Sequence, residues 1–173
     1  FDLVAWQLRV AAGEPLDRTQ ADLRREGHAI EARIYAENPD NRFLPSTGKL
    51  VYLGLPDHVA FENARVRVDS GVQTGDAITP HYDPMIAKLI VHGSDRDDAR
   101  RMMLAALEQT HVVGVQTNVA FLMRLMRDEA FATGDMDTGL IERRSATLLP
   151  GPIAASETML AVAAAAQLAR EHC

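Results

Sequence analysis

One arginine with two polar neighbours stands out in the segment GHAIEARIYAENPDNRFLPSTGKL, which runs from Gly27 to Leu50. Read with a period of two, residues 28–37 place mostly apolar side chains on one side and Glu31, Arg33 and Tyr35 on the other. A guanidinium stays protonated at any working pH, and its planar fork binds carboxylate-like anions through paired donors. The spacing leaves two interpretations open. Arg33 either pairs with nearby carboxylates on a solvated strand face, which is the more common case, or binds an anion.

Two further groups of charged residues lie beside or within predicted strands. Asp83 precedes Pro84, which holds it in an extended conformation, and Lys88 follows within an apolar strand. Arg67 and Asp69 alternate with valines in another strand. The first group fits a structural turn with Lys88 reaching from the sheet to solvent. The second fits either a solvated face or a charged subunit interface, and the spacing does not separate these two.

Several classes of chemistry lack the residues that they need. Six histidines are scattered along the chain without an HExxH pattern or a close pair on a predicted helix, so no metal site is predicted. The sequence contains neither a GxGxxG or GxxxxGK[ST] loop to hold a nucleotide nor a GxSxG serine. The single cysteine, Cys173, is the last residue, which excludes a disulfide framework and favours a reducing compartment.

Charge and hydropathy exclude two kinds of partner. The 173 residues carry a formal net charge of -6 without a basic cluster, so a nucleic acid is not expected as a direct partner. No apolar run reaches the roughly 20 residues that cross a bilayer, so the chain is expected to be soluble, without a membrane partner. Because Phe1 leads directly into a helical pattern without an initiator methionine, we expect the chain to be a piece of a longer one.

Hydrophobic periodicity predicts an α+β fold, in which a mixed, mostly antiparallel sheet packs on helices. The predicted strands cover residues 28–37, 49–53, 64–69 and 85–92, and residues 111–115 form a further short strand or a linker. The predicted helices cover residues 95–110 and 117–127, and an alanine-rich trailing helix covers 157–171, after a linker marked by Pro150 and Pro152. Ser94 is expected to cap the first of these helices, with Asp97 three residues later as in a capping box.

Six separated motifs, taken in order, resemble one known family. They are GHAIEARIYAENP, FLPSTGKL, VRVDSGVQTGDAI, HYDPMIAKLIVHG, DRDDARRMMLAAL and VVGVQTNVAFL, and they are similar to the C-terminal domain of biotin carboxylase. The opening DLVAWQLRVAAGEPL resembles the segment that joins this domain to an ATP-grasp region. The resemblance covers almost all of residues 2–145, and the agreement of six motifs in order makes it specific.

Within this family the sequence resembles the biotin-containing subunits of acyl-CoA carboxylases. The stretch GDMDTGLIER and the alanine-rich helix carry this resemblance, which favours 3-methylcrotonyl-CoA carboxylase over the propionyl-CoA and geranyl-CoA enzymes. The resemblance implies three parts. Residues 1–26 are a connecting helix and linker from a missing ATP-grasp region, 27–145 are the biotin carboxylase C-terminal domain, and 146–173 are a linker and helix leading toward the next domain.

The resemblance also implies an ATP-dependent ligase reaction. The family uses ATP and bicarbonate to form carboxyphosphate and then carboxylates N1′ of biotin. Proton loss from that nitrogen puts negative charge on the ureido oxygen, and a fixed cation beside this oxygen lowers the barrier. Arg33 matches the family arginine in this place, so it is expected to be catalytic and to bind biotin or bicarbonate. Glu31 and Tyr35 are expected to hold its guanidinium in position.

Other matches imply partners and missing parts. Arg67 matches a family position near the homodimer contact, and Asp83 and Lys88 are expected to be scaffold or interface residues. A biotin carboxyl carrier domain and a carboxyltransferase subunit are the further partners that the resemblance implies. The residues that bind ATP and Mg in the family, and the AMKM biotinylation site, have no match here. The chain is therefore expected to supply one wall of the biotin and bicarbonate site and to be inactive alone.

One competing hypothesis gives the domain no catalytic role. In it the domain is a noncatalytic dimerisation and docking module of a multidomain protein, and Arg33 belongs to a surface ion pair that contributes little. The resemblance further implies a cytoplasmic location in a bacterium, or the mitochondrial matrix in a eukaryote.

Overall fold

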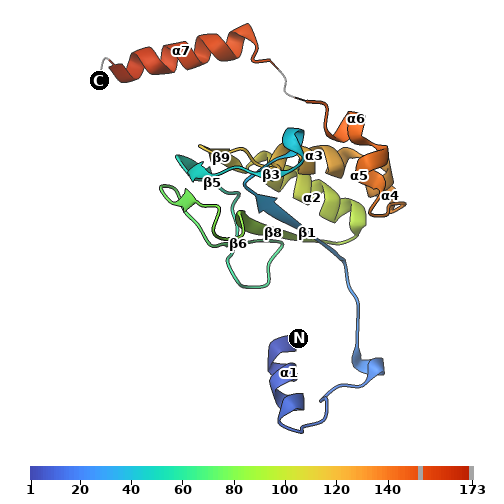
Figure 1. Ribbon diagram of the computed structural model, residues 1–173. Coiled ribbons are helices and arrows are strands. Elements are labelled where there is room, and N and C mark those ends of the chain that lie inside the picture. Colours follow the sequence, from blue (N-terminus) through green and yellow to red (C-terminus); the bar gives the residue numbers. More distant parts are fainter. Residues whose placement is uncertain (152–153, 172–173) are drawn as a thin grey trace.

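The computed structural model of the protein describes residues 1–151 and 154–171, and it has the α+β architecture predicted from the sequence (Figure 1). A three-stranded antiparallel sheet forms the centre, and helices cover one of its faces. The predictions that concern Pro152 and Cys173 lie outside the described residues.

The central sheet has the strand order β1-β8-β6, so the longest strand lies in the middle. The three strands are β1 (His28–Tyr35), β8 (Met85–Gly93) and β6 (Val66–Ser70). Both pairings are antiparallel, with Arg33 opposite Lys88 on one side of β8 and Asp69 opposite Lys88 on the other. A register shift between Ile34 and Tyr35 interrupts the β1–β8 pairing near its end. Because β1 is an edge strand, one row of its backbone groups needs partners from outside the sheet.

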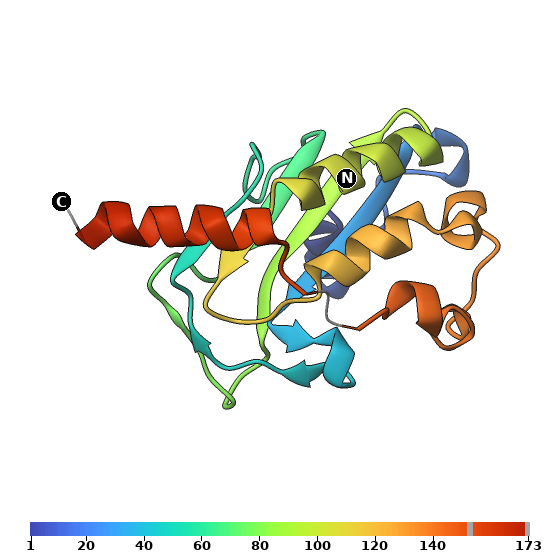
Figure 2. The same ribbon diagram turned by 90° about the horizontal axis from the view of Figure 1, so that it is seen from above.

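One face of this sheet packs against helices, and the hydrophobic core lies between the two layers. Helix α2 (Arg96–Glu108) and helix α3 (Val119–Arg127) lie side by side over it, as Figure 2 shows. Fully buried residues from both layers meet there, including Ile34, Leu89, Val91, Met103 and Leu107. The period of two in β1 and the helical period in α2 each turn one apolar side toward this contact, so local pattern and packing agree.

The start of α2 differs by one residue from the prediction. Asp95, not Ser94, is the N-cap, because its Oδ1 accepts the backbone N–H of Asp98 at 2.8 Å. Asp98 in turn accepts the N–H and the hydroxyl of Ser94 through Oδ2. Serine and aspartate are both good N-caps, so periodicity could not distinguish these adjacent positions.

The predicted strand over residues 49–53 is two short strands with different partners. Strand β4 (Gly48–Lys49) pairs with β7 (Ala77–Ile78), and β5 (Tyr52–Gly54) pairs with β9 (His111–Val113). The change of partner falls at a buried residue, since the N–H of Leu50 donates to Asp76 and the next N–H donates to Val113. The expectation that 49–53 joins the central sheet was therefore wrong, whereas residues 111–113 do form the short strand that was one of the two alternatives for 111–115.

The loop after β1 is folded into small elements. It contains β2 (Glu37–Asn38), a 3-10 turn η2 (Pro39–Asn41) and β3 (Leu44–Pro45), with β2 paired to β3. Two consecutive non-glycine residues, Arg42 and Phe43, have positive φ, and the Phe43 ring packs edge-on against Phe121 of α3. The aromatic contact ties the loop to the helical layer.

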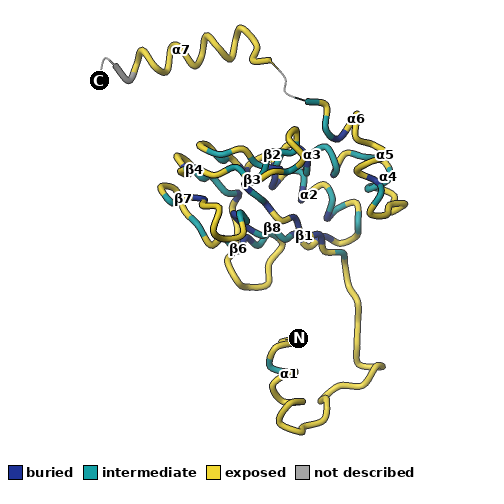
Figure 3. The backbone as a smooth tube through the Cα atoms, in the orientation of Figure 1, coloured by how far each residue is buried: buried dark blue, intermediate teal, exposed yellow. Residues whose placement is uncertain are grey.

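Shorter helices follow α3, and two flanking segments extend from the body. The shorter helices are α4 (Glu129–Thr133), α5 (Leu140–Arg143) and α6 (Ser145–Leu148). The flanks carry α1 (Leu3–Ala11), the 3-10 turn η1 (Gln20–Asp22) and α7 (Glu157–Glu171). Figures 1 and 3 show α1 and α7 on opposite sides of the body, with mostly exposed surfaces. Of the helices in the described ranges, none combines the length and the apolar character needed to span a membrane.

Candidate functional site

The open face of the central sheet, opposite α2, carries rows of charged side chains. One row runs across the three strands through Arg33, Lys88 and Asp69. The next row runs through Glu31, Ile90 and Arg67. Residues in register on neighbouring strands lie on the same face, so the fold brings together residues from three separate motifs.

Arg33 lies on the edge strand, with an exposed guanidinium. Its Nε donates to Oε1 of Glu31 at 3.0 Å, and its side chain keeps 57% of its surface accessible. The hydrogen bond to Glu31 raises the pKa of Arg33 above its usual range, and Tyr35 adds to the same shift. The expected contact with Glu31 is thus present, and the supporting roles of Glu31 and Tyr35 stay predictions. The arginine is a permanent cation that solvent or a ligand can reach.

Arg67 and Asp69 form a tighter pair on β6. The Nη2 of Arg67 lies 2.6 Å from Oδ2 of Asp69, whose side chain keeps only 10% of its surface exposed. Asp69 also accepts the backbone N–H of Phe61, which attaches the loop before β6. The hydrogen bond from Arg67 lowers the pKa of Asp69, and Lys88 contributes a smaller effect in the same direction. The positive charge of Lys88 therefore interacts favourably with the carboxylate of Asp69. In the sheet, Lys88 is in register with both Asp69 and Arg33.

Asp83 forms the turn that starts β8. Its Oδ1 accepts the backbone N–H of Met85 at 2.9 Å, across Pro84. The carbonyl of Pro84 accepts the N–H of Ala36, which links this turn to the end of β1. Burial raises the pKa of nearby Glu37, and the negative charge of Asp83 adds to this shift. These contacts account for a scaffold role of Asp83, whereas its role at an interface stays a prediction.

Asn118 is the residue at this site that the sequence did not single out. It precedes α3 and is 6% exposed. Its side chain contacts the backbone of Arg33 and Tyr35, and no side-chain hydrogen bond caps the helix. An asparagine before an amphipathic helix is the usual signal of a cap, so the pattern pointed only to a helix start.

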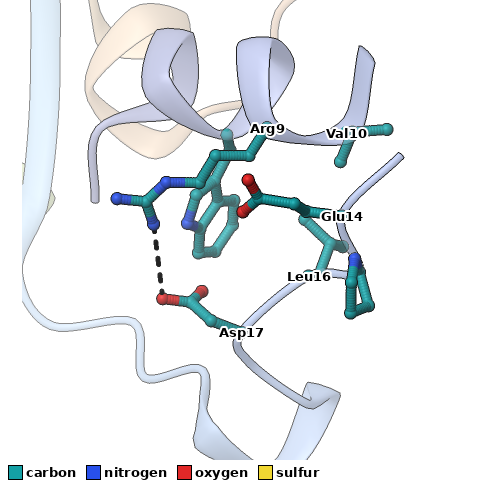
Figure 4. Close-up of a pocket in the computed structure, with 7 residues that line it drawn as sticks. Arg9, Val10, Glu14, Leu16 and Asp17 are labelled. Carbon is teal, nitrogen blue, oxygen red and sulfur yellow. Dashed lines mark ion pairs between the residues drawn. The ribbon is translucent and has the colours of Figure 1, made fainter. Parts of the chain in front are cut away.

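Two hollows on the surface of the described residues are lined by residues other than Arg33. A groove of about 590 Å³ lies along the open face and is lined by Ala29, Ile90 and Arg67, among others. A second pocket, of about 40 Å³, lies between α1 and the segment that follows it. There Arg9 faces Asp17 with 3.9 Å between Nη1 and Oδ2 (Figure 4). The second pocket is too small for a ligand of the size of biotin, and it belongs to a flank.

Metal ligands do not gather anywhere in residues 1–151 or 154–171. No group of three or more histidine, cysteine, aspartate or glutamate residues there has the spacing to hold an ion.

Comparison with known proteins identifies relatives of the whole chain. The sequence model of the family described as "Biotin carboxylase C-terminal domain" matches residues 31–143. The mitochondrial methylcrotonoyl-CoA carboxylase subunit alpha of Dictyostelium discoideum is 44% identical over 98% of this chain. The mitochondrial propionyl-CoA carboxylase alpha chain of Homo sapiens is 46% identical over 80% of it. The chain spans 24% and 18% of the length of these two relatives, respectively.

Solved structures show the same similarity. The biotin carboxylase domain dimer of Hydrogenobacter thermophilus 2-oxoglutarate carboxylase was solved in complex with MgADP, ADP and bicarbonate. It aligns with a TM-score of 0.77 and 36% sequence identity, covering 90% of this chain and 32% of that one.

Proposed function

Because this chain belongs to the biotin carboxylase C-terminal domain family, we propose that it supplies one wall of the biotin and bicarbonate site of an ATP-dependent biotin carboxylase. The observation that carries this proposal is the state of Arg33. Its guanidinium is exposed, permanently charged and held through Nε by Glu31, on a strand whose opposite face is buried. A pre-oriented cation of this kind is what a developing anion requires.

Arg33 acts in this proposal as an electrostatic partner. Biotin supplies a ureido nitrogen that accepts the carboxyl group, and its ureido oxygen gains negative charge when that nitrogen loses its proton. Because Glu31 already engages Nε, Arg33 meets the ligand through its terminal NH2 groups. These groups form a planar donor pair that suits either a ureido oxygen or bicarbonate. Because Glu31 holds the guanidinium in advance, Arg33 itself needs no reorganisation as the negative charge develops.

The remaining parts of the site belong to other segments in this proposal. ATP and Mg bind to an ATP-grasp region that precedes residues 1–26, residues 27–145 are the C-terminal domain, and 146–173 lead toward the next domain. The exposure of α1 and α7 supports this division. The solved relative holds MgADP and bicarbonate in a chain of which this one covers 32%, which also supports it. A biotin carboxyl carrier domain and a carboxyltransferase subunit complete the assembly.

The acyl-CoA that receives the carboxyl group is 3-methylcrotonyl-CoA in our proposal. The alignments with methylcrotonoyl-CoA carboxylase alpha subunits cover between 82% and 98% of the chain, with the Dictyostelium discoideum protein at 98%, and that with the propionyl-CoA carboxylase chain covers 80%. The wider alignment takes in the flanking segments, which supports this substrate. Both relatives are mitochondrial proteins. We propose the mitochondrial matrix for this chain if its source is a eukaryote, and the cytoplasm if it is a bacterium.

The open face around Arg67 is our proposed homodimer contact. The 590 Å³ groove there is bordered by Arg67, which is itself fixed by Asp69. A fixed arginine beside a partly apolar groove is typical of interface residues. The solved relative is a dimer of biotin carboxylase domains, which supports the same contact.

Replacing the arginine tests the catalytic part of the proposal. In the full-length carboxylase, Arg33→Ala should lower biotin carboxylation by about 100-fold or more, because a charge partner of the transition state is lost. The assay is bicarbonate-dependent and biotin-dependent turnover at saturating ATP. Arg101→Ala is the matched control, because Arg101 is another exposed arginine paired with carboxylates, on α2. If Arg33→Ala retains near-normal turnover, as a noncatalytic docking module would, the catalytic proposal is wrong.

A charge reversal tests the interface separately. Arg67→Glu should shift the full-length protein toward a smaller species in analytical ultracentrifugation, since it removes the pair with Asp69 and places two acids together. Arg101→Glu is the control on the opposite side of the sheet. An unchanged mass distribution for Arg67→Glu would remove this residue from the dimer contact.

A further inference from the structure

We propose that Asn118 is a positioning residue for Arg33, acting through the backbone of β1. This inference rests on the proposed function, because it concerns the same arginine. Asn118 does not face the open side of the sheet and would not touch a ligand there. Its effect is to fix the strand segment from which the guanidinium projects.

The contacts of Asn118 bracket one short piece of β1. Its Nδ2 donates to the carbonyl of Arg33 at 3.0 Å, and its Oδ1 accepts the N–H of Tyr35 at 3.0 Å. Its own backbone N–H donates to the carbonyl of Tyr35 at 3.2 Å. The carboxamide thus uses a donor and an acceptor on groups two residues apart, as the peptide group of a neighbouring strand would.

The position of these bonds in the sheet gives them weight. β1 is an edge strand, so Arg33 and Tyr35 have backbone groups that no strand satisfies. On the other side of β1, the pairing with β8 shifts register between Ile34 and Tyr35. A bulge loosens the ladder and re-aims nearby side chains. Asn118 therefore holds the outer edge of β1 where the inner edge is least regular.

The helix gives up a cap to make this contact. Asn118 is the N-cap of α3, yet its side chain accepts no hydrogen bond from that helix. An N-cap side chain normally satisfies one of the first free N–H groups of its helix, so the helix loses that stabilisation here. The side chain is instead 6% exposed and directed at β1. A buried amide with both ends engaged has one orientation, which is what positioning requires.

The consequence for chemistry is geometric. The side chain of Arg33 is held by Glu31, and its main chain is held by Asn118, so both ends of the residue are fixed. Loss of the Asn118 contacts would let the edge of β1 move while Arg33 kept its charge and its pair with Glu31. A displacement of about 1 Å in a positioning element can reduce a rate about 100-fold.

A double-mutant cycle in the full-length carboxylase tests the inference. The four proteins are the natural chain, Asn118→Ala, Arg33→Ala and the double variant, compared by kcat for biotin carboxylation. Asn118→Ala should lower kcat about 10- to 100-fold in the natural background, with KM for ATP changed by less than about twofold. It should have almost no further effect in the Arg33→Ala background, because the group it positions is gone.

Two further variants separate positioning from general stability. Asn118→Asp keeps the acceptor for Tyr35 but replaces the donor to Arg33 with an oxygen, so it should lower kcat as Asn118→Ala does. Thr110→Val is the matched control, because Thr110 is 5% exposed and donates to the carbonyl of Ala106, away from β1. It should lower the melting temperature without lowering kcat of the folded enzyme.

The outcomes discriminate. Equal loss of kcat from Asn118→Ala in both backgrounds, or no loss in the natural one, would overturn the positioning role. If Arg33→Ala alone leaves turnover near normal, the proposed function fails. That result comes from comparing two proteins that both keep Asn118, so it is distinct from a failure of the positioning role.

Discussion

Between Ala87 and Gly93, residues of β8 belong alternately to the buried and the open face of the central sheet, and the two faces differ in burial and in charge. Leu89 and Val91 have no exposed surface and pack beneath α2, whereas Lys88 and Ile90 face the open side and are half-buried. The partners of Leu89 in register are Ala32 and Val68, while those of Lys88 are Arg33 and Asp69. The same strand therefore contributes to the core and to a charged surface.

The difference between these faces separates stability from chemistry. The buried face removes apolar surface from water and tolerates no voids, so it dominates the free energy of unfolding. The open face carries ion pairs, and an exposed pair such as Arg33 with Glu31 contributes little to the free energy of unfolding. Substitutions on the buried face should therefore change mainly the free energy of unfolding. Substitutions at neighbouring positions on the open face should change it little.

The largest effect is expected from truncating the buried face at its centre. Leu89→Ala should lower the free energy of unfolding by about 2–5 kcal/mol, because it removes apolar contacts and leaves a cavity under α2. The neighbouring Lys88→Ala should change it by about 0.5 kcal/mol or less. Urea unfolding of both variants under the same conditions measures the difference, and similar losses for the two would contradict the distinction between the faces.

An added methyl group tests the tightness of the same face. Gly93 ends β8, and a Cβ there would overlap the backbone nitrogen of Ala99 at the start of α2. Gly93→Ala should cost about 1–3 kcal/mol, since neither backbone can yield without shifting the helix. Gly71→Ala is the control, because a Cβ at Gly71 meets no atom within 4 Å. Thermal unfolding compares them, and equal melting temperatures would show that α2 moves freely.

The smallest of these effects is expected on the open face, as a change in how the free energy of unfolding depends on pH. Arg67 lowers the pKa of Asp69 in the folded protein, so the carboxylate contributes stability above its unfolded pKa of about 3.9. That contribution is lost as the pH falls through the lower, folded pKa. Asp69→Asn should therefore flatten the fall in stability on acidification below about pH 4.

The control for this pH effect removes Arg67, which lowers the pKa of Asp69, and keeps Asp69 itself. Arg67→Gln should flatten the same part of the curve, because it deletes the hydrogen bond that lowers the pKa of Asp69. Urea midpoints measured between neutral and acidic pH provide the comparison. A curve for Arg67→Gln that stays as steep as that of the natural protein would assign the pH dependence to other groups.

Much of the fold could be predicted because its signals are local. The alternation in β1 and the apolar positions of α2 identify a strand and a helix wherever they lie in space. The resemblance of six motifs added the family, which the match to residues 31–143 bears out. Arg33 with Glu31 and Tyr35 was predicted in the same way, since residues two apart on a strand share a face.

The parts that could not be predicted depend on partners distant in the sequence. Residues 50–53 form one uninterrupted run of apolar and aromatic side chains, yet the N–H of Leu50 donates to the carbonyl of Asp76 and the next N–H donates to that of Val113. Nothing in the pattern marks that change of partner. Lys88 likewise lies on the central strand β8, and only the strand order places it next to Asp69 of β6 as well as Arg33 of β1.

The sequence by itself determined the long elements of the body, β1, β8, α2 and α3, and which side of each is apolar, because these follow from the backbone periods of two and 3.6 residues. Tertiary structure alone decided the partners of the backbone at the edge of β1. There Asn118, 85 residues after Arg33, leaves its own helix uncapped and binds the strand. The physical reason is that hydrogen-bonding groups must be satisfied wherever burial leaves them, and only the folded chain determines which groups those are.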